Sequence, residues 1–289
     1  MRLATSIQLE TIRHRQDEIE SRSVAFLSQH GYLQGIDSWL QILLDCHAFG
    51  LDRLRLRRSR PKYVEYLEAY STVSAVAYSN AETARLMLLR GFYGNVMNNI
   101  RALVMANDVV VDLTVTDESA GKWLRLRAFQ PGDKDREAGV LREYFKDYSV
   151  RKRVAESGAT SLSETLYGVA SESVHFSPWG THLFCAEDLA NPDEFYVQYT
   201  PQYHPFRAMF FALLLENSLP HLSGYFLMAC DRMFRAQNER LADLGSRYNV
   251  LLAAFEAEAP KRRAVLQMCK DAEDRVRAGE DFDSVFSGA

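Results

Sequence analysis

Proline is distributed unevenly along the chain, and this distribution constrains the fold more than any other feature of the sequence. Pro61 is the single proline in the first 130 residues, whereas most of the others fall between residues 178 and 220. Because proline breaks the interior of a helix, the proline-poor part can form long helices. Apolar residues recur there at the spacing of one helical face. The sequence therefore predicts an all-α fold built as a multi-helix bundle.

The same periodicity places the individual helices. Gly31 is expected to end the first helix, Asp37 or Ser38 to cap the second, and Pro61 to occupy the first turn of the third. A kink is expected near Pro220, inside a long apolar helix. Helices are predicted at residues 3–30, 38–54, 61–90, 92–114, 117–129, 134–156, 161–175 and 206–240, and from 241 to the end with a division near Pro260.

One pair of strands interrupts this helical pattern. Residues 181–186 and 195–200 have the character of strands and flank the turn-like Asn191-Pro192-Asp193. We therefore expect one short β-hairpin, inserted near residues 181–200 and acidic in composition. The helical bundle with its hairpin is expected to span residues 1–240, with the C-terminal helices of 241–289 packed on the same domain.

Composition and charge exclude several classes of protein. Hydrophobic residues make up 47% and charged residues 25% of the chain, which is typical of a folded protein. The formal net charge of −4 excludes a polycation, so a nucleic-acid interface would need a local basic patch. We find no apolar run of the kind that a signal peptide or a membrane span needs. Four widely separated cysteines indicate reduced thiols, and we expect a cytoplasmic protein without membrane contact.

The common catalytic and cofactor motifs are absent from the sequence. There is no phosphate-binding loop, no dinucleotide-binding glycine pattern, no nucleophile elbow and no H-E-x-x-H. Glu172 and His175 match half of a helical di-iron motif, whose second half is missing. No cofactor and no metal are therefore expected, and whether the chain is an enzyme stays open.

A polar stripe runs along the helix predicted at 92–114. Asn98, Arg101, Met105, Asp108 and Asp112 lie on one helical face. The structural interpretation is an arginine–aspartate network at a partly buried position, since buried charges occur in pairs. The functional interpretation is that Arg101 lines a cleft and presents its guanidinium to an anion.

A second polar stripe occupies the helix predicted at 161–175. Ser171 and His175 are four residues apart, so their side chains can meet on one face. Histidine exchanges protons near neutral pH and can act as an acid or a base. In the alternative, His175 anchors the helix to the turn that follows. The candidate catalytic residues are thus Arg101, Ser171 and His175.

Six basic residues, with no acidic residue among them, lie between positions 53 and 62. A solvated helix end explains such a run, because cations suit the C-terminus of a helix. A phosphate-binding surface is the alternative, with Tyr63 and Tyr66 stacking on bases. A further alternative is that the acidic hairpin covers the run and pairs with its charges. The candidate nucleic-acid-binding residues are Arg53, Arg55, Arg57, Arg58, Arg60 and Lys62.

Two short segments carry a family resemblance. Residues 91–101 read GFYGNVMNNIR, and residues 170–175 read ASESVH, ahead of a proline and the hairpin. These segments resemble a family of bacterial helical proteins distantly akin to the HEPN and abortive-infection proteins. In that family an Arg-x-x-x-Glu helix faces a Ser-x-x-x-His helix across the core. Arg101, Ser171 and His175 match this pattern, whereas Met105 occupies the glutamate position.

The resemblance covers roughly residues 63–215 and implies a bacterial defence or stress-response setting. Catalytic HEPN ribonucleases carry an arginine that is followed four to six residues later by a histidine, and no arginine of this chain has a histidine at that spacing. We therefore expect a helical interaction module, whose apolar helix at 206–230 packs against a protein partner or a second copy. The alternative is a protein that binds RNA or DNA through the basic run and cleaves it with Arg101 and His175.

Overall fold

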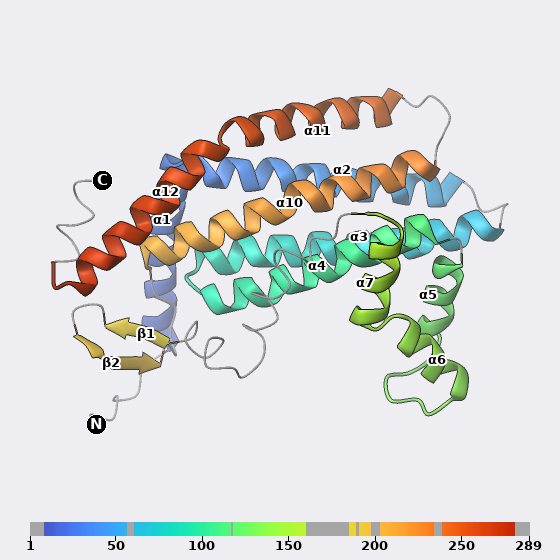
Figure 1. Cartoon of the computed structure of the whole chain (residues 1–289), viewed down its shortest axis with the longest axis horizontal. Coiled ribbons are helices and arrows are strands. Elements are labelled where there is room, and N and C mark those ends of the chain that lie inside the picture. Colours follow the sequence, from blue (N-terminus) through green and yellow to red (C-terminus); the bar gives the residue numbers. More distant parts are fainter. Residues whose placement is uncertain are drawn as a thin grey trace.

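The computed structural model describes residues 9–56, 61–116, 118–159, 185–188, 191–197, 203–233 and 239–280. These residues fold almost entirely into helices, which confirms the predicted all-α class (Figure 1). None of the helices in the described ranges combines the length and the hydropathy that a bilayer crossing requires.

Long helices lie where the apolar periodicity predicts them, and shorter ones connect them. The helices are α1 (Leu9–Gln29), α2 (Tyr32–Leu56), α3 (Pro61–Leu89), α4 (Tyr93–Val115), α5 (Ser119–Arg127), α6 (Arg136–Tyr144), α7 (Asp147–Glu156), α10 (Pro205–Met233), α11 (Glu239–Ala257) and α12 (Ala259–Arg277). α10 runs through Pro220 as one continuous helix, and α11 and α12 divide next to Pro260 as expected.

The helix α10 lies at the centre of the bundle. It packs against α2, α3 and α4, while α1 crosses one end and α11 covers the outer side of α2 and α10 (Figure 1). The short helices α5, α6 and α7 form a smaller group beside α3 and α4, near the end of α2 (Figure 1). This arrangement places the ends of α2 at opposite ends of the molecule.

The side chains of α10 form much of the core. Phe211 stacks on Tyr93 with ring centroids 5.7 Å apart, and Phe226 meets the ring of Tyr70 edge-on at 5.5 Å. All four side chains are buried, whereas Phe210 on the same helix is exposed. The apolar helix expected to contact a partner is therefore covered by the chain itself.

The strand region is short. β1 (Cys185–Asp188) and β2 (Asn191–Val197) pair in antiparallel fashion, with Cys185 opposite Val197. The three residues of the expected turn, from Asn191 to Asp193, belong to β2. Both strands lie near the end of the bundle that holds the start of α10, away from the end of α2 (Figure 1). Within one chain, the acidic strands therefore do not cover the end of α2.

Two predicted boundaries are wrong, for physical reasons that the structure shows. Asp37 and Ser38 do not cap α2, because the positive φ of 77° at Gly31 lets the chain reverse and begin α2 directly at Tyr32. The helix predicted at 134–156 is two helices, α6 and α7, since Lys146 between them has an extended backbone. The helix predicted at 161–175 lies outside the described residues.

Two ion pairs fix the register of α11 on α2. Arg240 bonds to Asp52 at 2.6 Å, and Arg247 bonds to Asp45 at 2.8 Å. Seven residues separate the arginines on α11 and seven separate the aspartates on α2, in opposite chain directions. Nearer the start of α2, the ring of Trp39 packs edge-on against two aromatic rings of α11, one of them in the last turn of that helix. α11 therefore runs antiparallel along α2, and its two ends lie near the two ends of α2.

We expect Phe226→Ala to destabilise the protein far more than Phe210→Ala. Phe226 is 1% exposed and Phe210 is 38% exposed, although both belong to α10. Removing a buried phenyl ring leaves a cavity and costs about 3–5 kcal/mol, whereas the exposed ring should cost about 1 kcal/mol or less. Urea unfolding measures both free energies, and equal losses would contradict the central position of α10.

Candidate functional site

The polar stripe of α4 holds a buried ion pair. Asp112 is fully buried and receives two hydrogen bonds from Arg153 of α7, at 2.7 and 2.9 Å. The guanidinium of Arg153 also lies 3.7 Å from the centroid of the Tyr144 ring. A paired arrangement of this kind avoids the desolvation cost of a lone buried carboxylate. For Asp112, the structural interpretation of the stripe is therefore the correct one.

Arg101 lies on the same face of α4 and contacts the same helix, α7. Its Nη2 atom lies 3.9 Å from an oxygen of Asp147, and both side chains are partly buried. Together with the Arg153 pair, this contact joins α7 to α4. Ser171 and His175 lie outside the described residues, so their meeting with Arg101 stays a prediction.

Two of the four cysteines, distant in the sequence, meet between α2 and α10. The hydroxyl of Tyr70 lies 3.0 Å from the sulfur of Cys230 and 3.3 Å from the carbonyl oxygen of Cys46. The hydrogen bond with Cys230, together with burial, raises the pKa of the Cys46 thiol well above its ordinary value. Because the thiolate is the reactive form, the Cys46 thiol is unreactive and has a structural role. Cys46 and Cys230 are both free and buried.

The basic run begins at the C-terminal end of α2. Arg53 and Arg55 occupy its last turn, where cations complement the helix dipole. Lys62 follows in the first turn of α3, with a side chain outside the described part. The remaining candidates of the run, Arg57, Arg58 and Arg60, also lie outside the described residues.

Tyr66, one of the two tyrosines proposed to stack on bases beside the basic run, contacts the core of the protein. Tyr66 packs against the core, and its hydroxyl lies 3.1 Å from the hydroxyl of Thr114. The Tyr66 ring is only partly buried, so stacking of a nucleic-acid base on it stays a prediction. The side chain of Tyr63 lies outside the described part of the chain.

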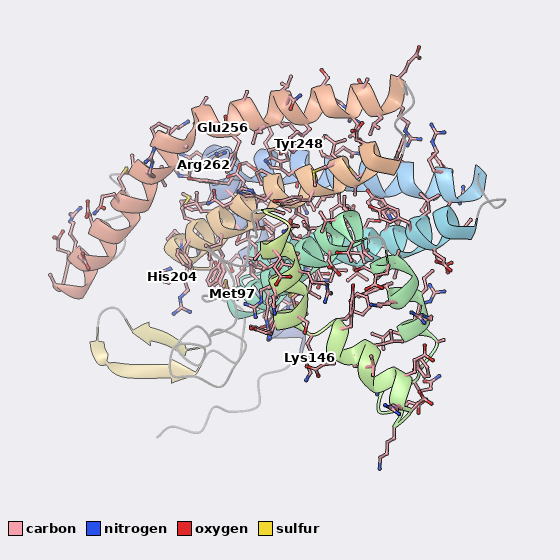
Figure 2. The ribbon with its side chains drawn as sticks, turned by 45° about the vertical axis from the view of Figure 1, so that its right-hand side comes forward. Met97, Lys146, His204, Tyr248, Glu256 and Arg262 are labelled. Atoms are coloured by element: carbon pink, nitrogen blue, oxygen red, sulfur yellow. The ribbon has the colours of Figure 1, made fainter. Side chains whose placement is uncertain are left out.

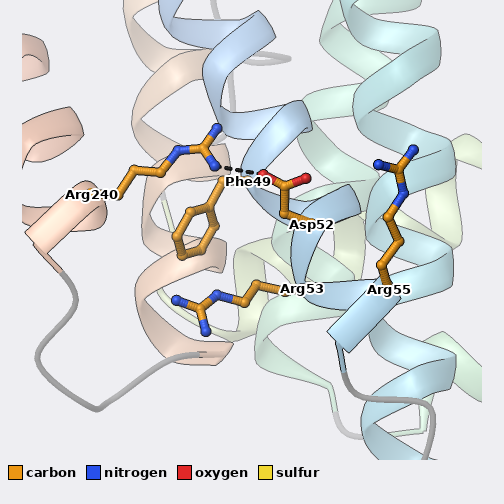
Figure 3. A pocket seen from close by; sticks show the side chains of 5 residues that line it. All are labelled: Phe49, Asp52, Arg53, Arg55 and Arg240. Carbon is orange, nitrogen blue, oxygen red and sulfur yellow. Dashed lines mark hydrogen bonds and ion pairs between the residues drawn. The ribbon is translucent and has the colours of Figure 1, made fainter.

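A pocket of about 370 Å³ lies where the end of α2 meets the start of α11 (Figure 3). Its lining combines residues of the last turns of α2 with one arginine of α11, from a part of the sequence far from the basic run. The lining residues are Phe49, Asp52, Arg53, Arg55 and Arg240. We call this group the arginine pocket.

Phe49 organises the arginine pocket. The guanidinium carbons of Arg53 and Arg240 lie 5.3 and 6.0 Å from the centroid of its ring, and the ring lies between the two arginines in Figure 3. Cations are attracted to aromatic faces at such distances. Arg240 is further held by its ion pair with Asp52. The ring and the aspartate thus orient two arginines from two helices.

Three arginines and one aspartate give the arginine pocket a positive charge. The helix dipole of α2 accounts for the arginines of its last turn. It does not account for Arg240, which comes from a separate helix and adds a third guanidinium. Arg240 was not among the sequence candidates. The matching spacing of Arg240 and Arg247 with Asp45 and Asp52 is the signal that could have identified it.

Comparisons with known proteins add no functional assignment. No family model, no curated protein and no solved structure matches the chain. Within the described ranges, no group of three histidine, cysteine, aspartate or glutamate side chains is arranged to hold a metal ion.

We expect Arg153→Ala to destabilise the protein by about 3–5 kcal/mol, because Asp112 would remain buried and charged without a partner. The matched control is Lys152→Ala, since Lys152 is 59% exposed and makes only a 3.9 Å contact with Glu156. That control should change the free energy of unfolding by less than about 0.5 kcal/mol.

Replacing both partners distinguishes a lost ion pair from a general loss of packing. The double variant Asp112→Leu with Arg153→Met leaves no buried charge, so its stability should exceed that of Arg153→Ala. Urea unfolding gives these values. A double variant at least as unstable as Arg153→Ala would show that the pair is not what joins α7 to α4.

Proposed function

We propose that the protein binds the phosphate backbone of a nucleic acid through the arginine pocket and the basic run that follows it. The observation that carries this proposal is that Arg53 and Arg240, from two helices, meet around one aromatic ring, with Arg55 lining the same pocket. Guanidinium groups match phosphate geometry because their N–H donors form a planar fork. The resemblance noted from the sequence adds a bacterial defence or stress-response setting to the proposal.

An extended polyanion suits this surface better than a single small anion. Arg53 and Arg55 begin a sequence that carries four more basic residues by position 62, with no acidic residue between. Asp52 offsets only one of the three arginine charges in the pocket. A string of cations of this length complements the regularly spaced phosphates of a nucleic acid.

The second candidate is the interaction module that the sequence analysis expected first, with α10 as its contact surface, and the structure gives it less support. The side chains of α10 are largely buried against α2, α3 and α4. Phe210 and Met228 are exposed on that helix, at 38% and 43%, but they stand far apart along it. We therefore place the nucleic-acid proposal first.

We expect labelled single-stranded and duplex RNA and DNA to bind at low salt, with affinity falling steeply as salt rises. Each phosphate contact contributes about 0.7 to the slope of log affinity against log salt for single strands, and about 0.9 for duplexes. The double variant Arg53→Glu with Arg55→Glu should weaken binding about tenfold or more and reduce the slope by about 1.4 on single strands. Fluorescence anisotropy measures both.

The matched control is Arg125→Glu with Arg127→Glu. These arginines are also two residues apart near the end of a helix, are 59% and 55% exposed, and change the net charge equally. The control should retain most of the affinity and the full slope. An equal loss in both double variants, or no binding at micromolar protein, would contradict the proposal. Circular dichroism confirms that each variant keeps its helices.

A further inference from the structure

A second cavity lies at the opposite end of α2 from the arginine pocket. It has a volume of about 340 Å³ and lies between the turn that joins α1 to α2 and the start of α12. His30 and Tyr32 line it on one side, and Glu258, Lys261 and Arg262 line it on the other. No sequence motif indicated this cavity, because its two walls are more than 200 residues apart.

The fold brings these walls together by two local devices. Gly31, with a φ of 77°, turns the chain sharply, so that the cavity contains the first residue of α2. The antiparallel register of α11 on α2 then carries the start of α12 to the same place. Figure 2 shows Tyr248 and Arg262 on the side of α11 and α12 that faces α10.

Arg262 is held in position by two hydrogen bonds and has further N–H donors. Its Nη1 donates to the carbonyl oxygen of Phe255 at 2.8 Å, and its Nη2 donates to Oε1 of Glu216 at 2.7 Å. The guanidinium carbon lies 4.2 Å from the centroid of the Phe255 ring. A guanidinium has five N–H donors, and among the described residues the other three have no acceptor. The side chain of Arg262 is 17% exposed. Its two hydrogen-bond partners hold it in place, and its remaining donors are accessible from the cavity.

Glu216 makes this orientation sensitive to a proton. The side chain is 1% exposed, its Oε1 lies where a Cβ on Gly35 of α2 would clash, and its Oε2 has no hydrogen-bond partner. Burial raises the pKa of Glu216 to about 7, although the charge and hydrogen bond of Arg262 lower it. The charge of Glu258 raises this pKa to a smaller extent. Near neutral pH the carboxyl group therefore alternates between two states. In the protonated state it does not neutralise Arg262.

We propose that this cavity binds a small oxyanion, a phosphate or carboxylate group, whose oxygens accept the remaining N–H donors of Arg262. Lys261 and His30 add donors at the mouth of the cavity, where Lys261 also contacts Glu258 at 3.1 Å. The positive end of the α2 dipole lies at the same place and favours a negative charge. This site is separate from the arginine pocket and does not depend on nucleic-acid binding.

The Glu216 carboxylate offsets the positive charge of the guanidinium to which the anion binds. Protonation of Glu216 removes this nearby negative charge, so the anion should bind more tightly as the pH falls through about 7. If binding requires the protonated form, affinity rises up to about tenfold between pH 8 and pH 6. Glu216 is thus a positioning residue, which acts on the anion through Arg262.

The test uses sulfate on the full chain, because sulfate is a tetrahedral oxyanion that does not titrate in this range. Calorimetric titration against a chloride blank of equal ionic strength should give saturable binding that strengthens from pH 8 to pH 6. Glu216→Gln, which keeps the shape of the side chain, should remove the pH dependence. The pH series is repeated in His30→Gln, where the dependence should persist. Titration with succinate then distinguishes a carboxylate site from a phosphate-type site.

Lys261→Gln should weaken sulfate binding about three- to tenfold, since it removes a charged donor from the mouth of the cavity. Its matched control is Lys146→Gln, because Lys146 also pairs with a glutamate three residues earlier and is similarly exposed, at 63% against 72%. That control should bind sulfate as the natural protein does. Equal binding by both variants, absence of saturable binding, or loss of binding in Arg53→Glu with Arg55→Glu would overturn the proposal.

Discussion

The burial of α10 is the constraint on which the rest of the structure depends. This helix is apolar on most of its circumference, and a helix of that kind is stable only when neighbours cover it. α2, α3 and α4 cover most of it, and α1, α11 and α12 contact further parts of it. Glu216 is a charged residue of this helix whose carboxylate is buried at the surface where α12 docks. A charge in that position needs a partner, and Arg262 supplies it.

The polar features of the molecule follow from how α11 covers this core. Its ion pairs to Asp45 and Asp52 fix one register, and its length then places one end near each end of α2. At the C-terminal end of α2, Arg240 completes a pocket with Arg53 and Arg55. At the N-terminal end, Arg262 completes a cavity beside the first residue of α2. The register of α11 on α2 thus places the residues of both sites, Arg240 within α11 and Arg262 in α12, which follows α11.

Local periodicity could predict most of the helices, because it depends only on near neighbours in the chain. Pro61 marks the start of α3, and the division of α11 from α12 follows from Pro260. The start of α2 was misplaced because a single glycine with positive φ, Gly31, suffices for the turn. Asp37 would be a suitable cap for α2 only if the turn between α1 and α2 were longer than the one that Gly31 makes.

The sites could be predicted only in part, because each combines residues from distant helices. Arg53 and Arg55 were identifiable as a local run of charge, whereas Arg240 joins them only through the packing of α11. Asp112 of the stripe on α4 is paired as the network interpretation expects, but its partner Arg153 was not identified. The pairing of Glu216 with Arg262 has no local signal, since it depends on the docking of α12.

The most direct test of the central claim, that α11 lies on α2 in one fixed register, is a set of charge-reversal cycles measured by urea unfolding. Asp45→Arg is combined with Arg247→Asp as the matched pair, and with Arg240→Asp as the crossed pair. The fixed register predicts a coupling free energy of about 1 kcal/mol for the matched pair and additive effects, within about 0.5 kcal/mol, for the crossed pair. Crossed coupling as large as matched coupling would contradict the register, and with it the account of how α11 places both sites at the ends of α2.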